Sequence, residues 1–236
     1  MSLAHFFAGA PAVGERVVLE GEDARHAAGS RRLRPGDRIT SGDGLGAMTT
    51  CRVEVASREA VEAQVLERWE VPPPSPRLRV CVAPPKGERL SWAVQKLTEI
   101  GVDAITLLET ARTVRHPPGL DRLARVARQA AKQSGRPRIP PVDGPMPWGE
   151  AVAGTEGLVV VLWEEATEGL LGLLPPGQPE AVTLFVGPEG GLAPEEAREA
   201  GGRGALLASL GPTLLRTETA ALAAASVVLA RYGRMG

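Results

Sequence analysis

Short apolar runs alternate with amphipathic stretches along residues 77–236, and this alternation predicts an α/β domain. Leu158–Leu162 and Val182–Val186 are continuously apolar, as expected of strands buried on both faces of a parallel sheet. Glu88–Ile100 has apolar residues at helical spacing, and Gly101 follows where the helix is expected to end. The predicted strands are Leu78–Ala83, Ala104–Leu108, Leu158–Leu162, Val182–Val186 and Ala205–Leu210, and the predicted helices are Glu88–Ile100, Leu120–Ser134, Pro194–Ala200 and Thr217–Tyr232.

The first 70 residues have a different pattern, in which short runs with a period of two are separated by turn residues. Such a series predicts a small β-barrel. The predicted strands are Ala4–Ala8, Arg16–Leu19, Arg38–Ser41, Ala47–Ala56 and Ala60–Glu67, with one helix at Asp23–Arg32. Ser41–Gly46 contains the pattern GxGxG, but a strand follows it and not a helix. We therefore expect a hairpin turn there and not a dinucleotide-binding loop.

Four prolines within residues 72–76 separate these two patterns. Proline cannot continue a helix or a central strand, so a run of this density is typical of a linker. The sequence therefore predicts a β-barrel domain at 1–70, a linker at 71–76 and an α/β domain with a mostly parallel sheet at 77–236.

Composition excludes several classes of protein. The 236 residues are 43% hydrophobic and 23% charged, which is ordinary for a folded protein. No apolar run reaches the roughly 18 residues of a membrane span, and no secretory signal is visible, so we expect a cytoplasmic protein without a membrane partner. Cys51 and Cys81 are too few for a disulfide framework, and the three histidines are scattered, so no metal site is expected.

The formal net charge of −1 conceals an uneven distribution. Residues 1–70 carry a net charge of −2, residues 77–140 one of +8, and residues 141–236 one of −7. Arg122, Arg125, Arg128 and Lys132 form a stripe along one predicted helix, and Arg136 and Arg138 follow it. This basic segment predicts contacts with nucleic acid phosphates. A solvated helix face that pairs with the acidic last third of the chain is the alternative.

Two glycine-bearing loops, Val186–Leu192 and Leu210–Ala220, each follow a predicted strand and precede a helix. Open α/β sheets bind ligands at such strand ends. The first loop lacks the Gly-Lys-Ser/Thr of a triphosphate-binding loop, and the second is apolar enough to pack against an adenine-like ring. The last helix is apolar on nearly all sides, which predicts burial against a second copy of the chain and hence a homodimer.

The sequences GPEGG at Gly187–Gly191 and LGPTLLRTETA at Leu210–Ala220 resemble the RsmE family of SPOUT-class methyltransferases, which methylate N3 of a uridine in ribosomal RNA of the small subunit. His26–Asp37, Lys86–Gly101 and Ala130–Arg136 are similar to three further motifs of that family. Five motifs spread over nearly the whole chain are more specific than any one of them.

The resemblance implies a trefoil-knotted SPOUT domain with a mostly parallel sheet, preceded by a PUA-like β-barrel, with S-adenosylmethionine as cofactor. It also implies a site at a homodimer interface and 16S ribosomal RNA, or the small ribosomal subunit, as partner. The implied cofactor residues are Leu162, Glu164, Val186, Gly187, Pro188, Glu189, Gly190, Gly191, Leu210, Gly211, Leu214, Leu215, Arg216, Thr219 and Ala220. The expected RNA contacts are Arg31, Arg34, Lys86, Arg125, Lys132, Arg136 and Arg138.

Methylation of uracil N3 requires that its imide proton be lost and that negative charge on the ring oxygens be stabilised. Arg216 is predicted to stabilise that charge, and Glu218 is the candidate general base. A position in the first helical turn, with Thr217 or Thr219 as the capping residue, is the alternative explanation of Glu218.

The chain departs from the family at two positions. His5 stands before Phe6 near the N-terminus, where relatives usually have an arginine, and Thr213 stands where they often carry a basic residue. Three other functions remain open: a non-catalytic RNA-binding protein, a Rossmann-type methyltransferase and a nucleotide-dependent metabolic enzyme. The second is disfavoured because no GxGxxG enters a helix with an acidic residue about 20 positions later.

Overall fold

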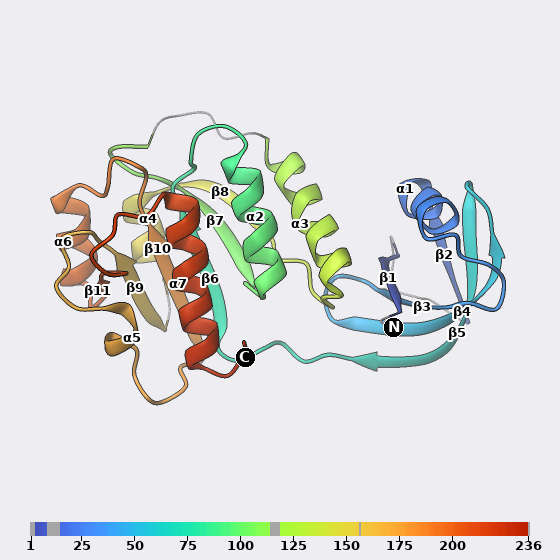
Figure 1. The fold of residues 1–236 in the computed structure, drawn as a ribbon. Helices are drawn as coiled ribbons and strands as arrows, with labels where there is room; N and C mark the ends of the chain where they lie inside the picture. The colour runs from blue at the N-terminus through green and yellow to red at the C-terminus, as the bar shows by residue number, and fades with distance from the viewer. Residues whose placement is uncertain (1–2, 9–14, 114–118, 156, 236) are drawn as a thin grey trace. The chain divides into compact units, whose positions relative to one another are not determined.

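The computed structural model describes residues 3–8, 15–113, 119–155 and 157–235 (Figure 1). The chain divides into two compact units, one formed by residues 1–73 with 131–139 and the other by residues 74–130 with 140–236. The division after Pro73 falls inside the proline run. The inclusion of 131–139 in the first unit differs from the predicted domains, because a segment distant in sequence packs against the N-terminal strands.

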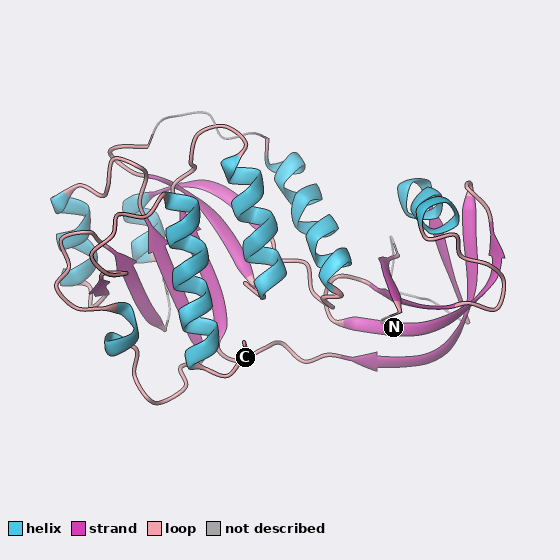
Figure 2. Ribbon diagram, viewed as in Figure 1, coloured by secondary structure: helices cyan, strands magenta, loops and turns pink. Residues whose placement is uncertain are grey.

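The N-terminal unit is built on a five-stranded sheet with the order β1-β3-β4-β5-β2. Only the β1–β3 pair is parallel in this sheet, and irregular registers near Cys51 and Val53 help the long strands β4 and β5 to curl. Figure 2 shows the strands of this unit, whose core includes Phe6, Leu19 and Ile39. The strands are β1 (Ala4–Phe7), β2 (Arg16–Glu20), β3 (Arg38–Gly42), β4 (Ala47–Ala56) and β5 (Ala60–Glu70).

The predicted hairpin between β3 and β4 is confirmed, since Gly42 pairs with Met48 across antiparallel strands. The Asp43 carboxylate accepts hydrogen bonds from the backbone N–H groups of Leu45 (2.6 Å) and Ala47 (3.1 Å), which holds the turn. The predicted helix Asp23–Arg32 is wrong in its limits. Helix α1 spans Gly21–Arg25 and continues as one π-helical turn, His26–Ser30.

Residues 131–139 are attached to the N-terminal strands by polar contacts. The Lys132 ammonium lies 2.7 Å from Oδ1 of Asp23, and both side chains are largely buried. The Arg138 guanidinium donates to the carbonyl of Val71 (2.8 Å), and the N–H of Ile139 donates to the carbonyl of Gly44 (2.9 Å). These contacts explain why this segment belongs to the first unit.

His5 on β1 is buried, and its Nδ1 lies 3.1 Å from Oγ1 of Thr40. Burial lowers the pKa of His5 to about 4, and the charge of Lys132 adds to this, while the backbone of Arg136 and the charge of Asp23 act in the opposite direction. A neutral, buried histidine is poorly suited to a contact with an RNA phosphate.

The free energy of unfolding of the N-terminal unit is expected to fall by about 3 kcal/mol between pH 6.5 and pH 4, because unfolded His5 takes up a proton that folded His5 does not. Above pH 6.5 His5 is neutral in both the folded and the unfolded state, so its protonation no longer lowers the free energy of unfolding. His5→Gln removes this titration and should flatten that part of the profile in urea unfolding measured at each pH. An unchanged slope in the variant would assign the effect to other groups.

The C-terminal unit contains a six-stranded sheet, with the order β11-β9-β10-β6-β7-β8, in which every pair of neighbouring strands is parallel. Its strands are β6 (Arg77–Val82), β7 (Ala104–Glu109), β8 (Val142–Pro147), β9 (Leu158–Leu162), β10 (Ala181–Val186) and β11 (Leu206–Ala208). Its helices are α2 (Arg89–Ile100), α3 (Leu120–Ser134), α4 (Trp148–Ala153), α5 (Leu170–Leu173), α6 (Pro194–Gly202) and α7 (Thr217–Arg231). The last residues of α3, from Ala131, belong to the first unit.

Helices cover both faces of this sheet, as a parallel sheet requires. Helix α7 packs on α2, β6 and β10, and Figure 1 shows α4 behind the strands that α7 crosses. After the edge strand β11, the chain thus returns to the middle of the sheet. The trefoil knot implied by the resemblance needs such a return, and the knot itself stays a prediction.

Three elements of this unit were not predicted: β8, α4 and α5. Strand β8 contains Gly144, Pro145 and Pro147, which are rare in strands and are accepted here at the edge of the sheet. The helices α4 and α5 have only six and four residues, too few to produce a helical period in the sequence. The predicted C-terminal glycine of α2 is confirmed, because Gly101 has a φ of 110°.

Candidate functional site

Strands β9, β10 and β11 are neighbours and parallel, so their carboxyl ends meet at one edge of the sheet. The loops that leave them after Leu162, Val186 and Ala208 enclose a cleft of about 430 Å³. Ligands of open α/β sheets bind at this edge, and the volume lies in the range of about 300–1,000 Å³ that small-molecule sites have. The two glycine-bearing loops therefore share one cavity.

Most residues expected to hold the cofactor line this cleft. They are Leu162, Glu164, Val186, Gly187, Pro188, Glu189, Gly190, Gly191, Leu210, Gly211, Leu214, Leu215 and Ala220. Two of the expected residues, Arg216 and Thr219, are exposed and do not line it. The residues that line it without having been predicted are Trp163, Leu192, Ala208, Ser209, Pro212, Thr213 and Thr217.

The loop after β10 depends on its glycines. A Cβ at Gly187 would lie 2.9 Å from Cγ of Leu192, and Gly191 has a φ of 71° with the Glu164 carboxylate where its Cβ would be. The Arg112 guanidinium donates to the carbonyl of Gly190 (2.8 Å) and so fixes the loop from outside. The backbone therefore comes close to the cleft and keeps one shape.

The loop after β11 is bound to the first loop. The hydroxyl of Thr217 donates to the carbonyl of Gly187 (3.1 Å), which joins the start of α7 to the end of β10. Within the loop, Gly211 has a φ of 110° and its N–H donates to the Ser209 hydroxyl (3.1 Å). Leu214 is 84% exposed, an unusual position for a leucine and one from which it can close on a bound ring.

The cleft is acidic. Glu164 and Glu189 line it, and it has neither lysine nor arginine among the described residues of its wall. Two carboxylates attract a cation and repel phosphates. The apolar leucines and the acidic groups together fit a ligand that combines a heterocycle with positive charge, as S-adenosylmethionine does.

The two predicted catalytic residues differ in their surroundings. Arg216 is exposed and is the N-cap residue of α7, next to Leu215 and Thr217 at the cleft. Because Arg216 occupies the N-cap without a side-chain hydrogen bond, neither Thr217 nor Thr219 is the capping residue, and that expectation is wrong. Glu218 is only 7% exposed and does not line the cleft.

Arg89, which was not singled out from the sequence, is close to two acidic residues, Glu218 of α7 and Glu189 of the first glycine-bearing loop. Its Nε lies 3.7 Å from Oε1 of Glu218, and its Nη1 lies 3.9 Å from Oε1 of Glu189. The second oxygen of Glu218 is buried and has no hydrogen-bond partner among the described residues. Arg89 is part of the motif that begins at Lys86, which was the one signal for it in the sequence.

The residues expected to contact RNA fall into two groups. Those that are exposed are Arg31, Arg34, Lys86 and Arg125. Lys132 and Arg138 are engaged with Asp23 and Val71, and Arg136 is half-buried. The structure thus gives Lys132 and Arg138 a role in packing that the stripe of charges did not indicate.

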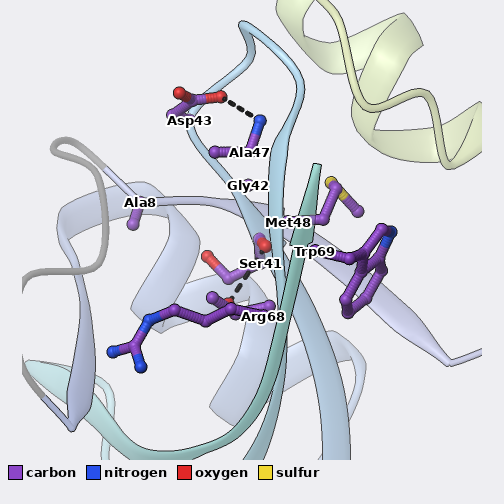
Figure 3. Close-up of a pocket in the computed structure, with 9 residues that line it drawn as sticks. Ala8, Ser41, Gly42, Asp43, Ala47, Met48, Arg68 and Trp69 are labelled. Atoms are coloured by element: carbon purple, nitrogen blue, oxygen red, sulfur yellow. Dashed lines mark hydrogen bonds between the residues drawn. The ribbon is translucent and has the colours of Figure 1, made fainter. Parts of the chain in front are cut away.

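Two other cavities lie away from this edge. One, of about 190 Å³, is in the N-terminal unit, where Arg68 and Trp69 extend to opposite sides of β5 and Asp43 bonds to Ala47 (Figure 3). The other, of about 530 Å³, includes Arg77 and Arg79 at the start of β6. Neither contains a residue that the sequence assigned to the cofactor.

No helix in the described ranges is long and apolar enough to cross a membrane. Among the same residues no three His, Cys, Asp or Glu side chains are grouped so that they could hold a metal ion.

Comparison with known proteins assigns the chain to a family. The family model for an RNA methyltransferase domain matches residues 72–229, and that for an RNA methyltransferase PUA domain matches residues 19–66. The ribosomal RNA small subunit methyltransferase E of Mycobacterium bovis is 43% identical over 92% of this chain and 87% of its own length.

Two solved structures cover nearly all of the chain. The protein of the same name from Neisseria gonorrhoeae, bound to S-adenosyl methionine, has a TM-score of 0.87 and 29% identity over 97% of this chain and 98% of its own. A methyltransferase from Legionella pneumophila, in complex with the bound cofactor SAM, has a TM-score of 0.85 and 29% identity over 98% of both chains. The chain is therefore an RNA methyltransferase with a PUA-like domain, and it belongs to the ribosomal RNA small subunit methyltransferase E family.

Proposed function

We propose that this protein transfers a methyl group from S-adenosylmethionine to N3 of a uridine in 16S ribosomal RNA. The family resemblance implies that this nucleotide is uridine 1498 of that RNA. The observation that carries this proposal is the acidic, partly apolar cleft at the ends of β9, β10 and β11. Relatives at 29% identity hold this cofactor. The same acidic wall argues against a nucleotide-dependent metabolic enzyme, whose phosphates it would repel.

When bound, S-adenosylmethionine supplies an electrophilic methyl group next to a positively charged sulfur. The leucines of the second loop pack against its ring, and the carboxylates of Glu164 and Glu189 complement its positive charge. Holding the two reactants in line is the largest contribution of the protein, on the order of 7 kcal/mol or more. The residues of the cleft therefore act chiefly by orientation.

The acceptor nitrogen has to lose its proton as the new N–C bond forms. Arg216, exposed at the edge of the cleft, stabilises the negative charge that develops on the uracil oxygens. Glu218 is the candidate for the proton acceptor, and its unpartnered second oxygen leaves a lone pair available for that step. Its burial requires that the start of α7 adjust when RNA binds.

The RNA is held by exposed basic residues of both units. Arg31 and Arg34 follow α1 in the PUA-like unit, and Lys86 and Arg125 belong to the methyltransferase unit. Such residues contact phosphates without reading sequence. An unpaired uridine is the accessible acceptor, because the edge of a paired base is covered by its partner.

A homodimer completes this proposal. Within one chain, α7 buries Ala221, Ala224 and Val228, whereas Ala223 and Val227 on its other side are half-exposed. An apolar helix side next to the cofactor loops is suited to contact a second copy. Because the proposed substrate is the small ribosomal subunit, the cytoplasm is the proposed location of the enzyme.

Incubation with small ribosomal subunits and S-adenosylmethionine labelled in its methyl group is expected to give 3-methyluridine, identified by digestion and mass spectrometry. Free 16S RNA and large subunits serve as parallel substrates. Label in another nucleoside would refute the proposed acceptor. RNA binding without label, and without heat on titration with S-adenosylmethionine, would instead establish a non-catalytic RNA-binding protein.

A further inference from the structure

Arg89 lies at the start of α2, where it connects three segments of the methyltransferase unit. Its guanidinium is within 4 Å of two carboxylates, 3.7 Å from Glu218 of α7 and 3.9 Å from Glu189 of the glycine loop. The N–H of Lys86, three residues earlier, donates to the same oxygen of Glu189 (3.3 Å). The segment from Lys86 to Arg89 thus contacts both loops of the cleft without lining it.

The two carboxylates are in different environments. The side chain of Glu218 is 9% exposed, and its second oxygen has no hydrogen-bond partner among the described residues. The side chain of Glu189 is 33% exposed and lines the cleft. Glu218 depends on Arg89 more than Glu189 does, because a buried charge without a partner is strongly unfavourable whereas an exposed one is hydrated.

The position of Glu218 is coupled to the wall of the cleft. Its neighbour Thr217 lines the cleft and bonds to the carbonyl of Gly187, and Ala220 lines it one turn later. If Glu218 moved toward water, the first turn of α7 would move with it and would shift both residues. The ion pair with Arg89 therefore acts on the shape of the cofactor site from outside it.

We propose that Arg89 is a positioning residue of the cofactor site: it compensates the buried charge of Glu218 and thereby holds the first turn of α7 against the glycine loop. This inference rests on the proposed function, in that the ligand whose site is held is S-adenosylmethionine. Arg89 itself does not line the cofactor cleft and acts on it through Glu218.

The test measures the affinity for S-adenosylmethionine by calorimetry in a double-mutant cycle. Arg89→Met leaves Glu218 charged and unpaired, and it is expected to weaken binding about tenfold. Glu218→Gln in the same chain removes the uncompensated charge, so the double variant Arg89→Met/Glu218→Gln is expected to recover most of that loss. Arg89→Lys keeps the charge and is expected to bind within about threefold of wild type.

A matched control is Arg203→Met at the C-cap of α6. Its Nε lies 3.7 Å from Oε1 of Glu199, the same distance as in the Arg89–Glu218 pair, but this pair is exposed and neither residue lines the cleft. Its affinity is expected to equal that of wild type.

Wild-type affinity in Arg89→Met would overturn the inference, and so would a double variant as weak as Arg89→Met, because a merely structural role is not rescued by removal of a charge. If Arg89→Met does not fold, Arg89→Lys and the double variant Arg89→Met/Glu218→Gln decide, because neither leaves the buried charge of Glu218 without compensation. Loss of affinity in both variants would overturn the inference. Wild-type protein that does not bind S-adenosylmethionine refutes the proposed function and the inference with it.

Discussion

Replacement of Arg216 by alanine is expected to lower the rate of methyl transfer by about 10²- to 10³-fold, the usual effect of removing one group that stabilises charge in a transition state. The affinity for S-adenosylmethionine is expected to stay within about threefold of wild type, since Arg216 does not line the cleft. The measurement is single-turnover transfer of labelled methyl to small ribosomal subunits, together with calorimetry.

The expectation follows from where α7 begins. Arg216 is the N-cap residue, and its side chain makes no capping hydrogen bond and is exposed. Its guanidinium forms no ion pair or hydrogen bond with the described residues. It therefore has no partner to give up when it binds an incoming anion. The N-terminus of α7 adds positive potential at the same place.

Arg231→Ala is the matched control, since Arg231 is an exposed arginine in the last turn of the same helix. It is expected to retain wild-type rates. Arg216→Lys separates charge from shape: a lysine that restores most of the rate shows that charge suffices, whereas a lysine as slow as alanine shows that the paired N–H donors are needed. Equal rates in wild type and Arg216→Ala would remove Arg216 from the mechanism.

The cofactor loops were predictable because their signal is local. A continuous apolar strand, then glycines, then a helix start define Gly187–Gly191, and the parallel order of β9, β10 and β11 brings the second loop beside it. The strand order itself was not visible in the sequence. The convergence of the loops was therefore an expectation that came from the family resemblance and not from periodicity.

The surroundings of Glu218 were less predictable, because they depend on contacts between residues far apart in the chain. Arg89 precedes Glu218 by more than a hundred residues and meets it only because α2 and α7 pack together. A glutamate in a first helical turn gives the same local pattern whether it is exposed or buried. Only the structure shows that this one is buried beside an arginine.

The basic stripe of α3 was the least reliable part of the sequence pattern. Charge spacing placed Lys132 with Arg125 on one face, and yet Arg125 is exposed while the Lys132 side chain is 10% exposed. Helical periodicity describes one helix and says nothing of what packs on its last turn. That turn belongs to the N-terminal unit, where a residue predicted to bind phosphate pairs instead with a buried carboxylate.

Substitution of Lys132 by methionine is accordingly expected to destabilise the N-terminal unit by about 3–5 kcal/mol, the usual effect of removing one partner from a buried ion pair. The ammonium lies 2.7 Å from Asp23, whose side chain is 16% exposed, and 6.0 Å from the centre of the Phe6 ring. Methionine keeps most of the stem of lysine, so the loss of packing is small and the charge dominates. Hydrogen exchange of the β1–β5 amides with increasing urea measures the effect unit by unit.

Lys96→Met provides the comparison, because Lys96 lies at the same 2.7 Å from Glu99, with side chains that are 33% and 25% exposed. An ion pair of that exposure contributes about 0–1 kcal/mol to the free energy of unfolding. Because the two ion pairs have the same distance and differ in burial, Lys96→Met isolates the effect of burial. The double variant Asp23→Asn/Lys132→Met is expected to regain a large part of the lost stability, since both charges of the buried ion pair are then removed. If Lys132→Met instead kept wild-type stability and lost affinity for ribosomal RNA, the phosphate contact predicted from the stripe would be correct and the role in packing wrong.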